Sequence, residues 1–365
     1  MRKIFVLIAI LMLPLMVTKA QNNPAQPAPI IAMADGQLYK VSAVDGSATL
    51  LADAKSDESI TPLRVGSISP DNKYLVYVKQ GPFTADSSYK SDLYRVTIAD
   101  GTTKLITPKG GIFDVPVQPD EQLSLDMPTW SSDGQRIYYF RSIYGTKPNA
   151  PRKPILFAYY DVAIGKHDLV TRIDPQDSIL NMDSVKDGIT TQWQVPSGAY
   201  SPFMTLFGPD NQIVNQSQVN VPYEHTLRGD DEAYFVQLKD LGQIDFKVGA
   251  MSGVQDTMDD GYYPAAESLN NSEKSMHVVS VQSDTNIFDI YGADYHKLIT
   301  SIANNTSFVY GLSPDGQQMA YLLFGDDLQA PIRILDMKGK VRELKFKAEQ
   351  ILWGAMDFVP FYAPG

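Results

Sequence analysis

The chain has 365 residues, of which 44% are hydrophobic and 20% charged, a balance that excludes wholesale disorder. Its formal net charge of -11 at pH 7 makes nucleic acid an unexpected partner, because an acidic surface repels phosphate backbones. The absence of cysteine excludes disulfides, a thiolate nucleophile and cysteine-ligated zinc.

The N-terminus has the pattern of a secretory signal peptide over residues 1–20. Arg2 and Lys3 precede the apolar stretch Ile4–Val17, and small residues around Ala20 offer a cleavage site. A membrane anchor is the alternative, but the stretch is shorter than the ~20 residues that span a bilayer. The pattern predicts a secreted or periplasmic protein of the cell envelope, with no membrane span after cleavage.

One phrase of sequence recurs along the rest of the chain. It consists of an apolar anchor, a turn of the Ser-Pro-Asp-Gly type and an apolar run. Asp accepts backbone hydrogen bonds in such a turn, and Gly or Asn tolerates positive φ, so each copy predicts a β-hairpin. Clear copies occupy 68–78, 130–140 and 312–323, and fainter ones follow Trp193, Leu269 and Trp353.

A second hairpin pattern, in which two strands flank a Gly-containing turn, alternates with the first. Two hairpins make a four-stranded antiparallel sheet, so six pairs predict an all-β, six-bladed propeller. The hairpin at Gln37 and the strand at Trp353 are expected to share one blade and close the ring. Ile30–Met33 is expected as its second strand, with Phe358–Tyr362 as the alternative. The second pattern occurs at 37–52, 92–107, 155–171, 232–248, 286–300 and 332–346.

The combined unit resembles the TolB-type propeller repeat, a relative of the WD repeat. The resemblance covers residues 30–362, most clearly at 68–107, 130–171 and 312–346. It implies a stand-alone propeller domain over 30–365. Residues 21–29, rich in Pro, Gln and Asn, are expected to form a disordered leader.

The lengths of the connections predict that the two rims of the propeller, at opposite ends of its strands, differ. The short Gly turns should share one rim, since antiparallel strands alternate in direction, and the longer connections should share the other. Long loops on a rigid scaffold often carry binding, although inert insertions are the alternative. The expected long connections are 79–91, 108–126, 142–154, 172–192, 208–231 and 252–265.

Aromatic residues in or beside these connections are the candidate binding residues, because exposed aromatic side chains often anchor interfaces. Packing of the loops onto one another is the alternative. His225 is also a candidate, since it stands among acidic residues that could form a metal or acid–base site, although an acidic solvated loop is the simpler interpretation. The candidates are Tyr89, Phe113, Tyr144, Tyr223, His225, Tyr262 and Tyr263.

Catalytic signatures are missing from the sequence: no Gly-x-Ser-x-Gly elbow occurs, and Asp256, Asp259 and Asp260 miss calcium-loop spacing. No catalytic residue, metal or cofactor is therefore predicted. The favoured function is a secreted, monomeric, non-enzymatic scaffold that binds a protein, peptide or glycan on the loop face. The alternative is a propeller-type hydrolase or lyase with carboxylates near the central channel. Its channel residues would come from Asp126, Gln192, Gln194, Glu267 and Asp357.

Overall fold

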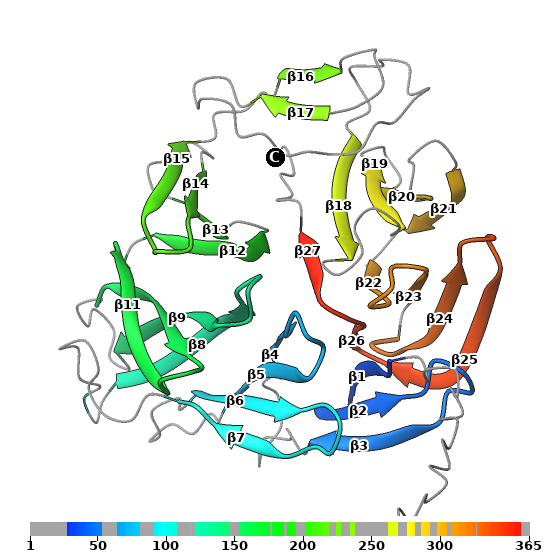
Figure 1. The fold of residues 1–365 in the computed structure, drawn as a ribbon, viewed down its shortest axis with the longest axis horizontal. Coiled ribbons are helices and arrows are strands. Elements are labelled where there is room, and N and C mark those ends of the chain that lie inside the picture. The colour runs from blue at the N-terminus through cyan, green and yellow to red at the C-terminus, as the bar shows by residue number, and fades with distance from the viewer. Residues whose placement is uncertain are drawn as a thin grey trace, which may run out of the picture.

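The protein is all-β in the part of the chain that its computed structural model describes. Four-stranded antiparallel sheets are arranged around a common centre (Figure 1). The expected signal peptide lies outside the described residues. These are 28–52, 64–80, 91–107, 118, 121–145, 153–175, 177–185, 188–194, 202–218, 224–227, 234–237, 262–268, 276–281, 286–292, 298–304, 308–325 and 327–358.

Four of the sheets follow the chain strand by strand. Sheet 2 contains β4 (Arg64–Ile68), β5 (Tyr74–Gln80), β6 (Ser91–Thr97) and β7 (Thr103–Leu105). Sheet 3 contains β8 (Glu121–Trp130), β9 (Arg136–Gly145), β10 (Ile155–Asp161) and β11 (Lys166–Ile173). Sheet 4 contains β12 (Ser178–Val185), β13 (Gly188–Gln194), β14 (Pro202–Phe207) and β15 (Ile213–Gln218). Sheet 6 contains β22 (Phe308–Leu312), β23 (Gln318–Leu323), β24 (Ala330–Asp336) and β25 (Val341–Ala348).

The C-terminal part of the chain contributes to two other sheets. Sheet 1 has the order β26-β1-β2-β3, with β26 (Gln350–Leu352), β1 (Ile30–Ala34), β2 (Gln37–Val41) and β3 (Ala48–Ala52). Sheet 5 has the order β21-β20-β19-β18-β27, with β18 (Tyr262–Ser268), β19 (His277–Val281), β20 (Asn286–Tyr291), β21 (Leu298–Asn304) and β27 (Met356–Phe358). A two-stranded sheet, β16 (Glu224–Leu227) with β17 (Tyr234–Gln237), lies apart from these.

The pairing of β1 with β26 agrees with the expected sharing of one sheet by the N-terminal hairpin and the strand before Trp353. β1 takes the second place in that sheet, as expected for Ile30–Met33. The competing segment around Phe358 pairs with β18 instead. The complete ring of six blades remains a prediction.

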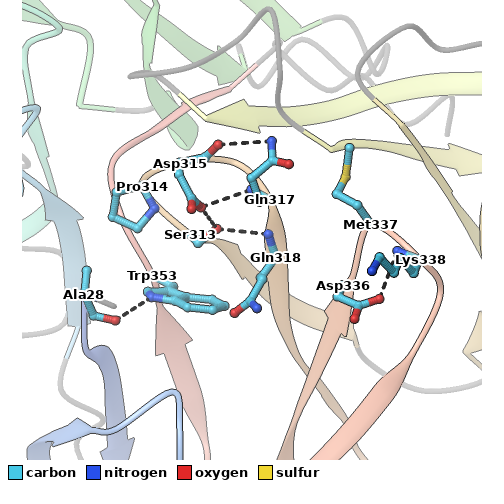
Figure 2. A pocket seen from close by; sticks show the side chains of 10 residues that line it. All are labelled: Ala28, Ser313, Pro314, Asp315, Gln317, Gln318, Asp336, Met337, Lys338 and Trp353. Atoms are coloured by element: carbon cyan, nitrogen blue, oxygen red, sulfur yellow. Dashed lines mark hydrogen bonds between the residues drawn. The ribbon is translucent and has the colours of Figure 1, made fainter. Parts of the chain in front are cut away.

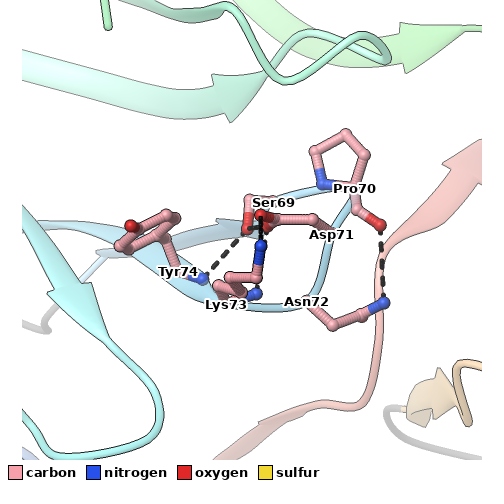
Figure 3. A network of polar contacts seen from close by, with 6 residues as sticks. All are labelled: Ser69, Pro70, Asp71, Asn72, Lys73 and Tyr74. Carbon is pink, nitrogen blue, oxygen red and sulfur yellow. Dashed lines mark hydrogen bonds and ion pairs between the residues drawn. The ribbon is translucent and has the colours of Figure 1, made fainter. Parts of the chain in front are cut away.

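The repeated phrase forms the same turn at each clear copy, and Figure 3 shows the first. Ser69 Oγ donates to Asp71 Oδ1 at 2.6 Å and accepts from the amide of Tyr74 at 2.9 Å. The Lys73 amide donates to the same Asp71 oxygen, and Asn72 holds φ at 57°. The Ser and Asp therefore fix the turn and start the next strand.

Apolar side chains fill the spaces between neighbouring sheets. One cluster contains Ile332 of sheet 6 and Ile30 of sheet 1, and others join sheets 1 and 2, 2 and 3, 3 and 4, and 5 and 6. Trp130 and Trp353 lie in such clusters, 3% and 1% exposed, and are therefore core residues between sheets. The side chain of Trp193 is outside the described set.

Two expected long connections contain strands. The segment 172–192 holds β12 and the start of β13, so the strand of Trp193 is second in its sheet and Gln192 and Gln194 are not on an innermost strand. The segment 208–231 begins with a short turn, in which Asn211 has a φ of 60°, followed by β15. The sequence predicted that 232–248 forms the outer hairpin of this blade. That prediction is wrong for sheet 4, because the fourth strand of the sheet is β15.

Candidate functional site

The sheet order places two kinds of connection at opposite ends of the strands. We call the end with the short turns the turn rim; its described turns are 42–47, 69–73, 98–102, 131–135, 162–165, 208–212, 313–317 and 337–340. We call the other end the loop rim; its longer connections are β3–β4, β5–β6, β7–β8, β9–β10 and β15–β18, and it also holds the short β1–β2 and β11–β12 connections. The separation follows from antiparallel pairing, in which successive connections alternate between the two ends.

The predicted binding residues are only partly placed. Tyr89, Phe113 and Tyr223 lie outside the described residues. Tyr144 lies in β9, paired with Gln122, in a strand where the loop 142–154 was expected. His225 lies in β16 opposite Val236, in a strand where a loop was expected.

Tyr262 and Tyr263 begin β18, next to the long β15–β18 connection, in a strand where the end of the loop 252–265 was expected. The structure describes the backbone of these residues. Their proposed roles in binding remain predictions.

A cavity of about 420 Å3 opens on the turn rim, where no site was predicted. It lies between the two turns of sheet 6 and the chain segments that flank sheet 1, as Figure 2 shows. The sequence signal that could have indicated this cavity is Trp353-Gly354, which follows β26 and lies beside the third clear copy of the repeated phrase. Its lining residues are Ala28, Ser313, Pro314, Asp315, Gln317, Gln318, Asp336, Met337, Lys338 and Trp353.

The base of the cavity is fixed by Trp353. Its indole Nε1 donates to the carbonyl of Ala28 at 2.9 Å, so this buried polar atom has a hydrogen-bond partner. The bond joins the segment before β1 to the segment after β26. The next residue, Gly354, has a φ of 81°. A Cβ there would lie 2.9 Å from the Leu312 carbonyl oxygen and 3.0 Å from Pro314 N, so this approach requires glycine.

The first polar wall is the turn after β22. Ser313 Oγ donates to Asp315 Oδ1 at 2.5 Å and accepts from the Gln318 amide at 3.0 Å. The same Asp315 oxygen accepts from the Gln317 amide at 3.1 Å. Figure 2 shows the side-chain amide of Gln318 beside the Trp353 indole. The wall therefore presents a carboxylate and two amide side chains above an apolar base.

The second polar wall is the turn after β24. Asp336 Oδ1 accepts from the amides of Lys340 at 3.0 Å and Lys338 at 2.9 Å. The Lys340 amide, followed by that of Lys338, holds the pKa of Asp336 below its usual range, so this carboxylate is ionised at neutral pH. With Met337 and Pro314 also in its lining, the cavity can hold a small group with an apolar body and hydrogen-bond donors.

His167 forms a separate buried cluster on the outer side of sheet 3. Its Nδ1 lies 2.8 Å from Tyr139 Oη, and its ring contacts that of Tyr160, which accepts from Lys104 Nζ at 3.1 Å. Burial lowers the pKa of His167 to about 4, against a hydrogen bond to the Ile106 backbone that raises it. The residue is therefore neutral at pH 7. It lies in β11.

No group of three His, Asp or Glu residues in the described ranges is placed to hold a metal ion. None of the described segments is a helix long and apolar enough to cross a membrane.

Comparisons with known proteins give similarity in structure alone. No protein-family model matches the chain, and a search of curated protein sequences finds no match. TolB from Acinetobacter baumannii has 11% identity and a TM-score of 0.41, over 80% of this chain and 66% of TolB. The β-propeller domain of the trilobed protease from Pyrococcus furiosus has 12% identity and a TM-score of 0.46, over 77% and 82% of the two chains.

Prolyl oligopeptidase B from Galerina marginata has 12% identity and a TM-score of 0.47, over 88% of this chain and 51% of the oligopeptidase. The chain thus spans about half the length of that enzyme and 66% of TolB. The similarities are to propeller domains of proteins with different activities. The assignment of an all-β, propeller-type architecture rests on the sheet order and the packing between sheets.

Proposed function

We propose that this chain is a secreted, non-enzymatic six-bladed propeller that binds a protein, peptide or glycan on its loop rim. Residues 1–20 would be the signal peptide, 21–29 a leader and 30–365 a single monomeric domain. The observation that carries the proposal is the distribution of connections between two rims: the turn rim holds short hydrogen-bonded turns, and the loop rim holds the longer connections beside short ones such as Asp35-Gly36. A rigid scaffold with elaborated loops at one end is the usual arrangement of a binding protein.

The proposed contacts come from sheets 2 to 5, the first four blades counted from Ile68, where the longer connections concentrate. Tyr89, Phe113 and Tyr144 would contribute from sheets 2 and 3, and Tyr262 and Tyr263 from the start of sheet 5. Tyrosine buries a large area on binding and keeps a polar atom for hydrogen bonding. The acidic chain favours a partner with a neutral or basic contact surface.

The test is capture of a partner from the native secretome by the full chain and by two loop variants. Shortening 81–90 or 146–152 should weaken capture at least tenfold and leave the thermal midpoint within about 2 °C, because loop length changes stability little. Asp133→Asn is the control, since it perturbs a turn-rim turn away from both the loops and the cavity. Loss of capture by a folded Asp133→Asn chain, with capture retained by the loop variants, contradicts the proposal.

The cavity on the turn rim supports a second binding candidate, which takes a small ligand or a single side chain of a partner. Asp315 and Asp133 make the same bonds, to Ser313 and Ser131 at 2.5 and 2.6 Å, but only Asp315 lines the cavity. Asp315→Asn and Asp133→Asn should therefore lower stability alike. Loss of partner capture by Asp315→Asn alone would place binding in the cavity.

The alternative, a hydrolase or lyase, would place its acid–base groups near the centre of the ring. Asp126 accepts from Ser124 Oγ at 2.8 Å, and Glu267 faces Asp357 in the register of β18 and β27. Turnover of oligosaccharides or peptides by the wild-type chain, lost in Glu267→Gln or Asp126→Asn, would favour this alternative. We expect no such turnover.

A further inference from the structure

The outermost strand of sheet 6 differs in charge from the outermost strands of the other sheets. Residues 338–347 include the end of the turn before β25 and most of β25 itself. Five of these ten residues are Lys or Arg and one is acidic, in a chain with a net charge of -11. β3, β15 and β21 have no charged residue, β7 has one Lys, and β11 has two basic residues and an Asp. We call 338–347 the basic edge; its strand lies on the outer side of sheet 6, away from the common centre (Figure 1).

Alternate side chains attach β25 to sheet 1. Leu344 is buried in the apolar cluster that the two sheets share, and the ring of Phe346 lies 5.2 Å from that of Tyr39. Arg342 donates to the carbonyl of Val44 at 3.1 Å. Because side chains alternate along a strand, the odd-numbered residues of β25 point to its opposite face.

The opposite face is exposed and carries cations without counter-charges. Val341, Glu343, Lys345 and Lys347 are all exposed. Glu343 Oε2 accepts from Arg333 Nε at 3.1 Å, so the single acid of the basic edge already has a cationic partner. Within the described ranges, no carboxylate lies at ion-pair distance from Lys345 or Lys347. This face therefore presents a positive charge to the solvent.

β25 is also an open strand edge. Its backbone pairs with β24, and it is the last strand in the order β22-β23-β24-β25. The hydrogen bonds of its side chains go to Arg333 and to the turn after β2, so its outer side has no partner among the described residues. An edge strand directs backbone donors and acceptors outward at alternate residues.

Lysine on such an edge keeps identical edges apart, and this protection is the simplest role of Lys345 and Lys347. Two basic edges repel each other, so a second copy of the chain is a poor partner for this strand. An extended segment with acidic side chains opposite the two lysines is attracted instead. At physiological salt charges act over about 8 Å, so these local cations outweigh the acidic remainder of the chain at this edge.

We propose that the outer edge of β25 is a docking site for an extended acidic peptide of a partner, which adds to sheet 6 as a further strand with Asp or Glu opposite Lys345 and Lys347. Main-chain hydrogen bonds supply the affinity, and the two lysines supply the selectivity. This site is separate from the loop rim and does not depend on the function proposed there.

The probe is a fluorescent peptide of the same length as β25 in which Glu alternates with Val, titrated into the full chain by anisotropy at physiological salt. A second peptide has Lys in place of Glu. A third has Pro in place of Val, which keeps the charge but removes half of the backbone donors. We expect the Glu-Val peptide to bind at least tenfold more tightly than either of the others.

The variant that tests the site is Lys345→Glu, and the matched control is Lys166→Glu, at an exposed position of the outermost strand β11. Lys345→Glu should weaken binding of the Glu-Val peptide at least fivefold, and Lys166→Glu should leave it within twofold. Both substitutions are at exposed positions, so both chains should keep the thermal midpoint of the wild type within about 2 °C.

Hydrogen–deuterium exchange then locates the added strand. We expect the Glu-Val peptide to slow exchange at alternate amides of 341–348 and to leave 166–173 unchanged. Absence of binding by the wild type overturns the proposal, as does equal weakening by the two substitutions. Equal binding of the Glu-Val and Glu-Pro peptides, or of dextran sulfate in competition with them, also overturns it, because the basic edge then attracts any polyanion. If Lys345→Glu fails to fold, the Glu-Pro comparison and the exchange pattern decide.

Discussion

The serine that begins each repeated turn determines its geometry. Ser69, Ser131 and Ser313 each donate to an Asp two residues later, at 2.6, 2.6 and 2.5 Å. Each also accepts from the amide that starts the next strand, at 2.9, 2.9 and 3.0 Å. The recurrence of this bonding explains why the phrase is repeated in the sequence, whatever the function of each blade.

Removal of the Asp side chain from one turn should therefore have a measurable cost. Asp133→Ala removes the acceptor of the Gln135 amide and the nearer of the two acceptors of Ser131 Oγ, which then has only the Arg136 carbonyl at 3.2 Å. We expect a loss of about 1–2 kcal/mol in the free energy of unfolding, measured in urea. Lys345→Ala, at an exposed position of an outermost strand, is the control and should change stability by less than about 0.5 kcal/mol. Equal effects of the two substitutions would contradict the role given to the turn.

Trp130 tests the packing between sheets 2 and 3. Its ring stacks on Tyr74 at 6.2 Å, and its Nε1 has no hydrogen-bond partner in the described part of the chain, so its contribution is mainly apolar. Trp130→Ala should cost about 3–5 kcal/mol. Leu328→Ala, at a position 86% exposed, should be close to neutral. A thermal midpoint unchanged by Trp130→Ala would place this residue on the surface.

His167 should make stability depend on pH. Its pKa is about 4 in the folded chain and 6.5 in the unfolded one, so the unfolded chain takes up a proton first as the pH falls. The stability due to neutral His167 is therefore complete above pH ~6.5 and is lost progressively down to about pH 4. Tyr139, Tyr160 and Lys104 surround the ring and add no acid to stabilise its charged form.

The measurement compares urea midpoints of wild type and His167→Asn between pH 7.5 and 4.5. The variant should be less stable at pH 7.5, and the difference should shrink as the pH falls. The other histidines and the carboxylates contribute equally to both proteins. A difference that stays constant over this range would mean that His167 is exposed in solution.

At the scale of strands, the sequence predicted the hairpins whose turns carry the full phrase. The predicted hairpins after Ile68, Trp130 and Leu312 are confirmed. In each of them an Asp and a Gly or Asn with positive φ favour a tight turn at that point of the chain. β12 was missed although Asp187-Gly188, a turn signal of the same kind, closely follows Ser178–Val185 in the sequence and β13 begins at that Gly. The error shifted sheet 4 by one strand.

The turn Gly208-Pro-Asp-Asn211 was a signal that the interpretation passed over. Its bonds, Gly208 N to Gln212 O and Asn211 N to Gly208 O, both 2.9 Å, match those of the turns that were recognised. It also packs on sheet 3, where Tyr138 Oη donates to Asn211 Oδ1 at 2.8 Å. The cavity and the place of β27 could not be predicted in this way, because both depend on where distant segments meet.

At the scale of the whole molecule, the two ends of the chain meet in two ways. β26 pairs with β1, and Trp353 bonds to the Ala28 carbonyl, so the N-terminal hairpin depends on residues more than three hundred positions later. β27 then continues to sheet 5. Such long-range pairing resembles the joining of ends that propellers use to protect their sheet edges. We therefore expect deletion of 350–365 to destabilise the entire domain. The deleted chain should unfold in a single cooperative transition with a lower thermal midpoint.

The central claim is that the loop rim binds the partner. Hydrogen–deuterium exchange of the full chain, with and without the partner captured from the secretome, tests it most directly. We predict protection of amides in 81–90, 108–120 and 146–152 and unchanged exchange in the turn 131–135. Protection confined to 313–318 and 336–338, with the loop-rim segments unchanged, would contradict the claim and place binding on the turn rim.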